Sequence, residues 1–248
     1  MKKGCISLFV VFAGLFTSSV SADEAVFKKI IEDYLSVTTI KASITQHIYP
    51  EDGSTEIFSG HYFAASKGLI RIEYLKPERQ TVVVNDSGLY WYYTDRKLLF
   101  QSGKKSGGNS SIPLLMNVIP AESLKGIVVA KEGMRFYSLF KMADVYSITS
   151  GKNKTTMTLW VDPAARIIKR KIIIDDSGRE MIREEYKAHA FINGVYIPSR
   201  IELTARTASG VMQTITEYGS IVLNGPIDKD MFEFKITPEM KVRMINER

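Results

Sequence analysis

Cysteine is almost absent from this sequence. The 248 residues contain a single cysteine, Cys5, at the start of an N-terminal apolar run that ends at Phe16. Once that run is removed, no thiol remains, so disulfides, thiol catalysis and cysteine-ligated metals are excluded from the design. Stability must come from packing, and the chain is long enough to bury a sizeable core.

Motifs of known catalytic and metal-binding chemistry are also missing. His47, His61 and His189 are far apart and have no carboxylate or second histidine at ligand spacing. There is no G-x-S-x-G elbow, no H-E-x-x-H and, despite Gly103 and Gly107, no phosphate-binding loop. We therefore expect no metal, no cofactor and no enzymatic activity.

Two pairs of adjacent carboxylates are the remaining candidates for acid–base chemistry. Asp175 and Asp176 precede Ser-Gly and are typical of a turn, whereas Glu184 and Glu185 alternate along a predicted strand and point to opposite faces. Neither pair converges by sequence alone. A hydrolase that uses carboxylates brought together by folding stays open as an alternative.

Positive charge is in only slight excess. The chain has 33 Lys and Arg against 27 Asp and Glu, and Lys2 and Lys3 belong to the N-terminal segment described next. The densest basic run, Arg166 to Lys171, is interrupted by two isoleucines. Nucleic-acid binding normally needs clustered charge, so we expect none.

The first 22 residues are typical of a secretory signal peptide. Two lysines precede the apolar run, and Val20-Ser21-Ala22 predicts cleavage before Asp23. The run is shorter than the roughly 20 residues that span a bilayer, which disfavours the alternative of an uncleaved anchor. Cys5 lies at the wrong end of the run for lipidation, so residues 23–248 are expected to form an exported, soluble, unlipidated protein.

The spacing of apolar residues changes after residue 37. Asp23 to Val37 has helical spacing and predicts an amphipathic helix that covers a sheet. The later segments are short, β-rich and separated by polar turns, which predicts a mainly β, antiparallel, single domain over 23–248. The predicted strands are 41–49, 57–64, 69–75, 81–85, 89–94, 97–101, 135–140, 145–149, 155–161, 167–175, 181–191, 196–205 and 211–222.

A nearly all-apolar segment interrupts the strands. Pro113 suits the first turn of a helix and Pro120 its end, so 112–119 is predicted to be helical, with a second short helix at 121–125. An apolar helix needs a hydrophobic surface beneath it. It is interpreted either as a flap over a cavity or as a cap at one end of a barrel.

The strands from 69 to 94 carry apolar side chains on both faces. Ile70, Ile72 and Tyr74 alternate with charged residues, but Leu89 to Tyr93 is large and apolar throughout. Such a sheet must be covered twice, and one cover could be a ligand. The candidate cavity residues are Ile70, Ile72, Tyr74, Val82, Val84, Trp91, Tyr93, Leu114, Leu115, Met116, Val118 and Ile119.

Three segments resemble the periplasmic outer-membrane lipoprotein carrier (LolA) family. They are Phe58 to Pro77, Asp86 to Tyr93, and Leu223 to Phe234 followed by Pro238. The resemblance implies an incomplete (open) antiparallel β-barrel of about eleven strands with helices covering the concave face. It also implies an apolar cavity for lipoprotein acyl chains, located in the periplasm.

The resemblance further implies a set of partners. A monomeric carrier of this kind takes acylated lipoproteins from an inner-membrane lipoprotein-releasing ABC transporter and passes them to an outer-membrane acceptor. The alternative is a LolA-like sensor or scaffold that binds a protein partner, because a fold does not fix function.

One departure from the family pattern concerns gating. The family's basic-Pro-Gly turn, whose arginine bonds to the covering helices, appears here as Ser66-Lys67-Gly68. Serine cannot supply a fork of donors. Lys67 and Arg71 are the candidates for that role.

Overall fold

The computed structural model describes residues 22–103, 127–150, 156–207 and 210–245. Among these residues the chain forms the helix α1 (Ala22–Leu35), the short 3-10 helices η1 (Ser66–Gly68) and η4 (Lys229–Phe232), and fourteen strands. No helix in these ranges has the length and apolar character needed to cross a membrane. The expected signal peptide, apart from Ala22, lies outside the described residues.

All fourteen strands belong to one sheet. Their bounds are β1 (Thr39–Tyr49), β2 (Glu56–Ala65), β3 (Leu69–Lys76), β4 (Gln80–Asn85), β5 (Gly88–Tyr93), β6 (Leu98–Ser102), β7 (Ile127–Ser138), β8 (Lys141–Ser150), β9 (Thr156–Asp162), β10 (Ile167–Ile174), β11 (Glu180–Ile192), β12 (Val195–Thr207), β13 (Gly210–Leu223) and β14 (Lys241–Met244).

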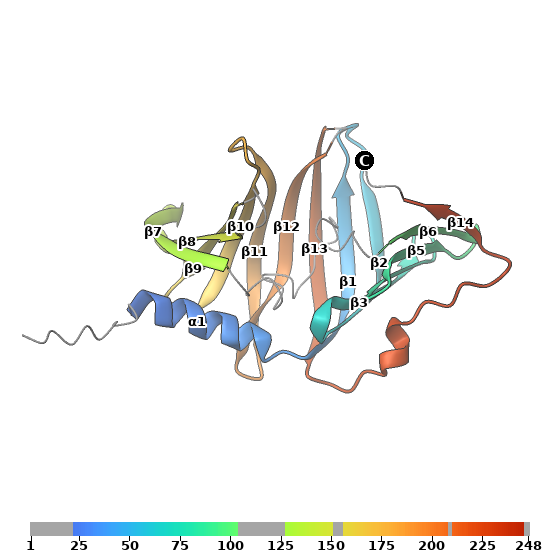
Figure 1. Ribbon diagram of the computed structural model, residues 1–248, viewed down its shortest axis with the longest axis horizontal. Helices are drawn as coiled ribbons and strands as arrows, with labels where there is room; N and C mark the ends of the chain where they lie inside the picture. The colour runs from blue at the N-terminus through green and yellow to red at the C-terminus, as the bar shows by residue number, and fades with distance from the viewer. Residues whose placement is uncertain (1–21, 104–126, 151–155, 208–209, 246–248) are drawn as a thin grey trace, which may run out of the picture.

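The sheet consists of two antiparallel meanders joined side by side. The strand order is β14-β6-β5-β4-β3-β2-β1-β13-β12-β11-β10-β9-β8-β7, so β1 pairs with β13, and β14 adds to β6 in parallel. The free edges, β7 and β14, lie towards opposite ends of the molecule (Figure 1). The prediction of a mainly β, open barrel is confirmed, with fourteen strands in place of about eleven.

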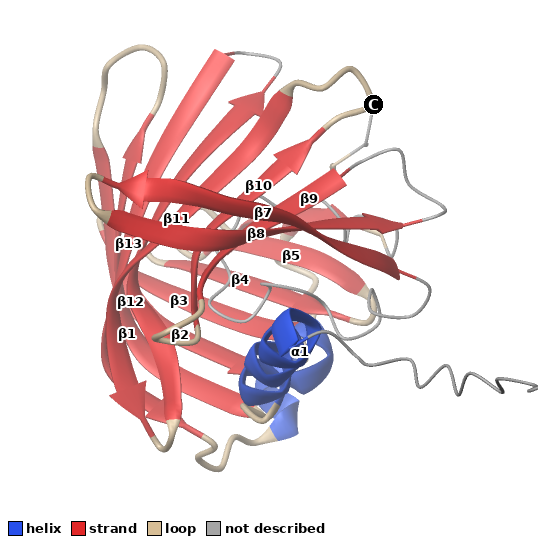
Figure 2. Cartoon of the chain, turned by 90° about the vertical axis from the view of Figure 1, so that its left-hand side faces the viewer, coloured by secondary structure: helices blue, strands red, loops and turns tan. Residues whose placement is uncertain are grey.

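Helix α1 lies within the curve of the sheet (Figure 2). Phe27, Ile30 and Ile31 recur at helical spacing and are buried, while Lys29 on the outer side pairs with Asp33 at 2.7 Å. Such a helix forms because one face can be buried while the other stays in water. The predicted amphipathic helix is confirmed and ends at Leu35, two residues earlier than expected.

The connection from α1 to β1 is tied to the end of β13. Asn224 has a φ of 58° and accepts hydrogen bonds from the Thr38 backbone N–H (2.7 Å) and the Thr38 hydroxyl (3.1 Å). Asparagine tolerates this left-handed conformation better than most residues. The Thr39 hydroxyl also donates to the Gly225 carbonyl at 2.6 Å. These bonds fix where the helix leaves the sheet.

The C-terminal segment covers the other face of β3 to β6. Phe234 stacks on Tyr90 with ring centroids 5.2 Å apart and packs against the cluster that contains buried Val83 and Leu99. The Asn85 side-chain amide donates to the Phe232 carbonyl at 2.8 Å. The second cover that the two-sided apolar strands require is therefore a segment of the chain itself.

The β7–β8 hairpin differs from its prediction. Strand β7 ends at Ser138, and the turn is formed by Leu139 and Phe140, which the prediction placed inside a strand of 135–140. The prediction was wrong because the turn contains no Gly, Pro, Asn or Asp. The first half of β7 and the whole of β14 were also not predicted.

Gln46 provides a test of the β1–β13 junction. Its buried side chain donates to the Thr216 hydroxyl (3.1 Å) and accepts from the Tyr74 hydroxyl (2.8 Å). We expect Gln46→Ala to lower the free energy of unfolding by about 2–4 kcal/mol, because two buried hydroxyls lose this partner and a cavity opens. Urea unfolding measures the change.

Gln213→Ala is the matched control. Gln213 lies on β13 with an exposed side chain, so its loss should change the free energy of unfolding by less than about 0.5 kcal/mol. Equal losses from the two substitutions would show that the buried bonds at Gln46 do not hold the junction.

Candidate functional site

The predicted cavity residues on β3, β4 and β5 share one face of the sheet. Ile72 pairs with Val82 and Val82 pairs with Trp91, and directly opposed residues point to the same side. The register adds the other four to this face: Ile70, Tyr74, Val84 and Tyr93. Four of the seven are buried, whereas Val84, Trp91 and Tyr93 are partly exposed. Their contact with a ligand stays a prediction.

The same apolar face continues across the rest of the sheet. Gln46 of β1 pairs with Thr216, Thr216 with Ile201, and Ile201 with Tyr186 of β11. The buried residues of this concave face and of α1 form one cluster that reaches Ile148 on β8. Phe27 of α1 packs on Tyr146 of β8 with ring centroids 4.6 Å apart. One cluster of buried apolar residues therefore extends along the inside of the curve from β3 to β8, and the curve itself is seen in Figure 2.

Polar atoms in this wall bond to one another. Trp91 Nε1 donates to the Gln80 side-chain oxygen at 2.8 Å, and the Tyr74 hydroxyl donates to Gln46. Burial raises the pKa of the Tyr74 hydroxyl, so it remains a neutral donor. Groups paired in this way need no partner from a ligand, and the wall can accept an apolar molecule.

Two ion pairs also face the concave side. Lys171 and Glu184 lie 2.7 Å apart with side chains 8% and 10% exposed, and the Tyr186 hydroxyl donates to Glu184. Nearer the free edge, Lys131 and Asp144 pair at 3.1 Å. Sequence reasoning missed both pairs because the partners come from different strands and meet only through the register.

Glu184 and Glu185 point to opposite faces, as their alternation predicts. Glu184 faces the concave side, whereas Glu185 pairs with Arg170 on the other face at 2.5 Å. The two carboxylates therefore do not converge.

Comparison with known proteins identifies the architecture. A DUF1329 family protein from Desulfovibrio piger superposes with a TM-score of 0.66 at 12% identity, covering 85% of this chain and 96% of that one. A LolA superfamily protein from Nitrosomonas europaea gives 0.60 at 12% identity, with coverage of 85% and 97%. The fold is that of LolA superfamily proteins.

A third structure agrees with this assignment. An outer membrane lipoprotein-sorting protein domain from Vibrio parahaemolyticus superposes with a TM-score of 0.60 at 10% identity, covering 82% of this chain and 94% of that one. No family model and no curated protein matches the sequence. The resemblance inferred from the motifs is confirmed for the fold, and at this identity the likeness extends no further.

The segments that carried the resemblance occupy structural positions in the LolA-type fold. Phe58 to Pro77 spans most of β2 and all of β3, and Asp86 to Tyr93 contains β5. Leu223 to Phe234 runs from the end of β13 through η4 to the cover over Tyr90. The first two motifs therefore lie in strands of the sheet, and the third forms its outer cover.

One of the two candidate gating residues, Arg71, does not face the concave side. Arg71 lies on the outer face, where it pairs with Glu73 at 2.7 Å and donates to the Met231 carbonyl at 3.0 Å. It thus fastens η4 to β3, and its predicted contact with helices on the concave face is absent from the described part of the chain. The side chain of Lys67 lies outside that part.

The predicted cavity-covering helix at 112–119 also lies outside the described residues. The five candidates on it are Leu114, Leu115, Met116, Val118 and Ile119, and their role stays a prediction.

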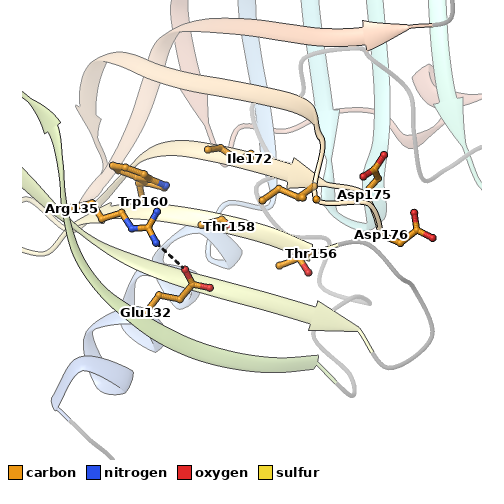
Figure 3. Close-up of a pocket in the computed structure, with 10 residues that line it drawn as sticks. Glu132, Arg135, Thr156, Thr158, Trp160, Ile172, Asp175 and Asp176 are labelled. Carbon is orange, nitrogen blue, oxygen red and sulfur yellow. Dashed lines mark ion pairs between the residues drawn. The ribbon is translucent and has the colours of Figure 1, made fainter.

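A polar pocket of about 470 Å³ lies on the outer face between β7, β9 and β10 (Figure 3). Glu132 and Arg135, both on β7, line one side of it and pair at 3.6 Å. Asp175 accepts hydrogen bonds from the backbone and hydroxyl of Ser177 and from the backbone of Arg179, and these bonds lower its pKa to about 2. Asp175 is therefore the turn residue that its sequence predicted. Across the residues that the structure describes, no cluster of potential metal ligands occurs.

His189 gives a pH-dependent prediction. Burial lowers its pKa to about 4, and the positive charge of Lys169 adds to this effect. The folded state thus keeps His189 neutral, while the unfolded chain binds a proton near pH 6.5. The free energy of unfolding should therefore fall as the pH decreases from about 6.5 to about 4. His189→Gln should reduce this fall in urea unfolding at several pH values.

His61→Gln serves as the control for loss of a histidine. His61 is exposed on β2, and the variant should keep the pH dependence of the parent. An unchanged profile in His189→Gln would rule out His189 as the origin of the effect.

Proposed function

We propose that this protein is a periplasmic carrier that binds the acyl chains of lipoproteins, or of a closely related lipid, against the concave face. The observation that supports it most is the cluster of apolar residues that extends along the concave face from β5 to β8, in which the polar atoms of Trp91 and Tyr74 already have partners. The carrier acts by binding and not by catalysis.

Hydrophobic burial can supply the affinity. Each methylene group removed from water contributes about 0.8 kcal/mol, so one acyl chain contributes on the order of 10 kcal/mol before the costs of association. A surface built from Ile, Val, Tyr and Trp side chains recognises chain length and bulk more than headgroup chemistry. Such a carrier suits a family of acylated cargoes.

Cargo must also be released. Phe27, Ile30 and Ile31 of α1 are buried against the concave face, so a ligand that extends beneath α1 competes with the helix for the same surface. This competition lowers the net affinity and returns free energy when cargo leaves. The proposed route begins at an inner-membrane lipoprotein-releasing ABC transporter and ends at an outer-membrane acceptor, in line with the sorting domain from Vibrio parahaemolyticus that shares the fold.

The two tryptophans allow a direct test of cargo binding. Trp91 lies on the concave face, whereas Trp160 lies on the outer face beside Arg170. We expect the Trp160→Phe protein, in which Trp91 is the only tryptophan, to change its emission when titrated with a fatty acid or a synthetic acylated peptide. The Trp91→Phe protein, which keeps Trp160, should not respond. A response from Trp160 alone would reject the concave face as the site.

A lining substitution tests the site's apolar character. Val84 is partly exposed on the concave face, and Val84→Asn should weaken binding of the same probe by roughly tenfold through loss of apolar contact. Leu75→Asn is the control, because Leu75 is 53% exposed and does not belong to the apolar cluster of the concave side. Its affinity should equal that of the parent.

Mass spectrometry of material extracted from the purified protein distinguishes the alternatives. Co-purifying acylated molecules are expected from a carrier. A stoichiometric protein partner without lipid would favour the scaffold and overturn the carrier.

A further inference from the structure

The turn between β7 and β8 exposes two large apolar side chains. Leu139 is 84% exposed and Phe140 is 88% exposed, and neither packs into the hydrophobic clusters of the fold. Turn positions normally carry Gly, Asn, Asp or Pro, which satisfy or shape the backbone. Two exposed apolar residues there do not stabilise the folded chain, so their chemistry points to contact with something else.

The exposed apolar surface extends along the hairpin. Phe136 of β7 pairs with Met142 of β8, and these side chains are 65% and 39% exposed. Met134, two residues before Phe136, is 54% exposed. Together with Leu139 and Phe140, these residues form the hairpin tip.

The hairpin tip and the buried concave cluster lie on the same face of β8. Met142 alternates along β8 with Asp144, Tyr146 and Ile148, so the four residues share one face. Tyr146 and Ile148 belong to the buried cluster of the concave side, and Asp144 is paired with Lys131. The concave face is therefore buried at Tyr146 and Ile148 and exposed to solvent at the hairpin tip. One ion pair lies between these two parts of the face.

Basic side chains lie beside the hairpin tip. Lys141 follows Phe140 directly, and the Lys169 ammonium lies 5.7 Å from the Tyr137 ring on the same hairpin. Arg166 is exposed in the adjacent β9–β10 turn. The nearby Asp162 carboxylate accepts hydrogen bonds from the Tyr137 hydroxyl and from the backbone N–H groups of its own turn.

The exposed apolar turn and the basic side chains beside it together indicate the kind of partner. Apolar side chains at a projecting turn with lysine and arginine beside them match the boundary of a bilayer, where acyl chains lie next to anionic headgroups. We propose that the hairpin tip docks on an anionic membrane surface, with Leu139 and Phe140 inserted and Lys141, Lys169 and Arg166 at the headgroups. This surface goes beyond the proposed carrier function and does not depend on which cargo the cavity binds.

Vesicle sedimentation tests the proposal on the cargo-free protein. The parent should bind phosphatidylethanolamine–phosphatidylglycerol vesicles more tightly than phosphatidylcholine vesicles. The double variant Leu139→Ser/Phe140→Ser should lose roughly tenfold to a hundredfold in affinity, since two large side chains no longer enter the bilayer. Lys141→Gln should lower the affinity by about fivefold, and only for the anionic vesicles.

A matched variant controls for general loss of apolar surface. Ile57→Ser/Leu75→Ser removes side chains that are 50% and 53% exposed on β2 and β3, far along the sheet from the hairpin, and should bind vesicles like the parent. Equal losses in both double variants, or none in the hairpin variant, would overturn the proposal. The proposal would also be overturned if the hairpin variant lost self-association in analytical ultracentrifugation but kept vesicle binding. The hairpin tip would then bind a second copy of the chain.

A second measurement reports insertion directly. Phe140→Cys in the protein expressed from residue 23 onwards, which contains no other cysteine, provides one thiol for an environment-sensitive fluorophore. Its emission should shift to the blue on anionic vesicles and be quenched by brominated acyl chains. If the emission spectrum on vesicles is the same as that of the dye in water, docking through the hairpin tip is contradicted. Cargo binding, measured by Trp91, fails or succeeds independently of this result.

Discussion

The antiparallel ladder between β1 and β13 is the interaction on which the rest of the structure depends. It joins positions such as Gln46 and Thr216, which are 170 residues apart in the chain, and without it β1–β6 and β7–β13 would be two separate meanders. Closing so long a loop costs conformational entropy, which the shared apolar face must offset. Because the ladder is in register, the apolar residues of both halves fall on one side and form a single wall.

An apolar sheet of this size must be covered to keep water away from it. Segments near both ends of the described chain provide this cover. Helix α1 packs on the concave side immediately before β1, while the segment after β13 crosses to the other face and places Phe234 on Tyr90. Asn224 connects the two covers at their origin through its bonds to Thr38. The junction strands thus determine where each cover begins, and the side covered by α1 is the one to which the proposed function assigns the ligand.

From the sequence, the face on which a residue lies was predicted more accurately than the identity of neighbouring strands. Alternation placed Ile70, Ile72 and Tyr74 correctly on one face of their strand, since side-chain direction within a strand follows from local geometry alone. The pairing of β1 with β13, the Lys171–Glu184 ion pair and the cover by Phe234 depend on contacts across long stretches of chain, which no local pattern encodes. The turn at Leu139 and Phe140 escaped prediction for another reason, because its residues suit contact with a partner more than the geometry of a turn.

The Lys131–Asp144 pair stands where the buried wall ends and the exposed hairpin tip begins. Asp144 is buried, and a buried carboxylate is tolerated only when it is paired. A lipid chain that moved along this face between cavity and bilayer would have to pass the pair, whereas the flanking Tyr146 and Met142 would offer it apolar contact. The pair therefore separates two apolar surfaces that would otherwise merge at the edge where the sheet has no further described strand.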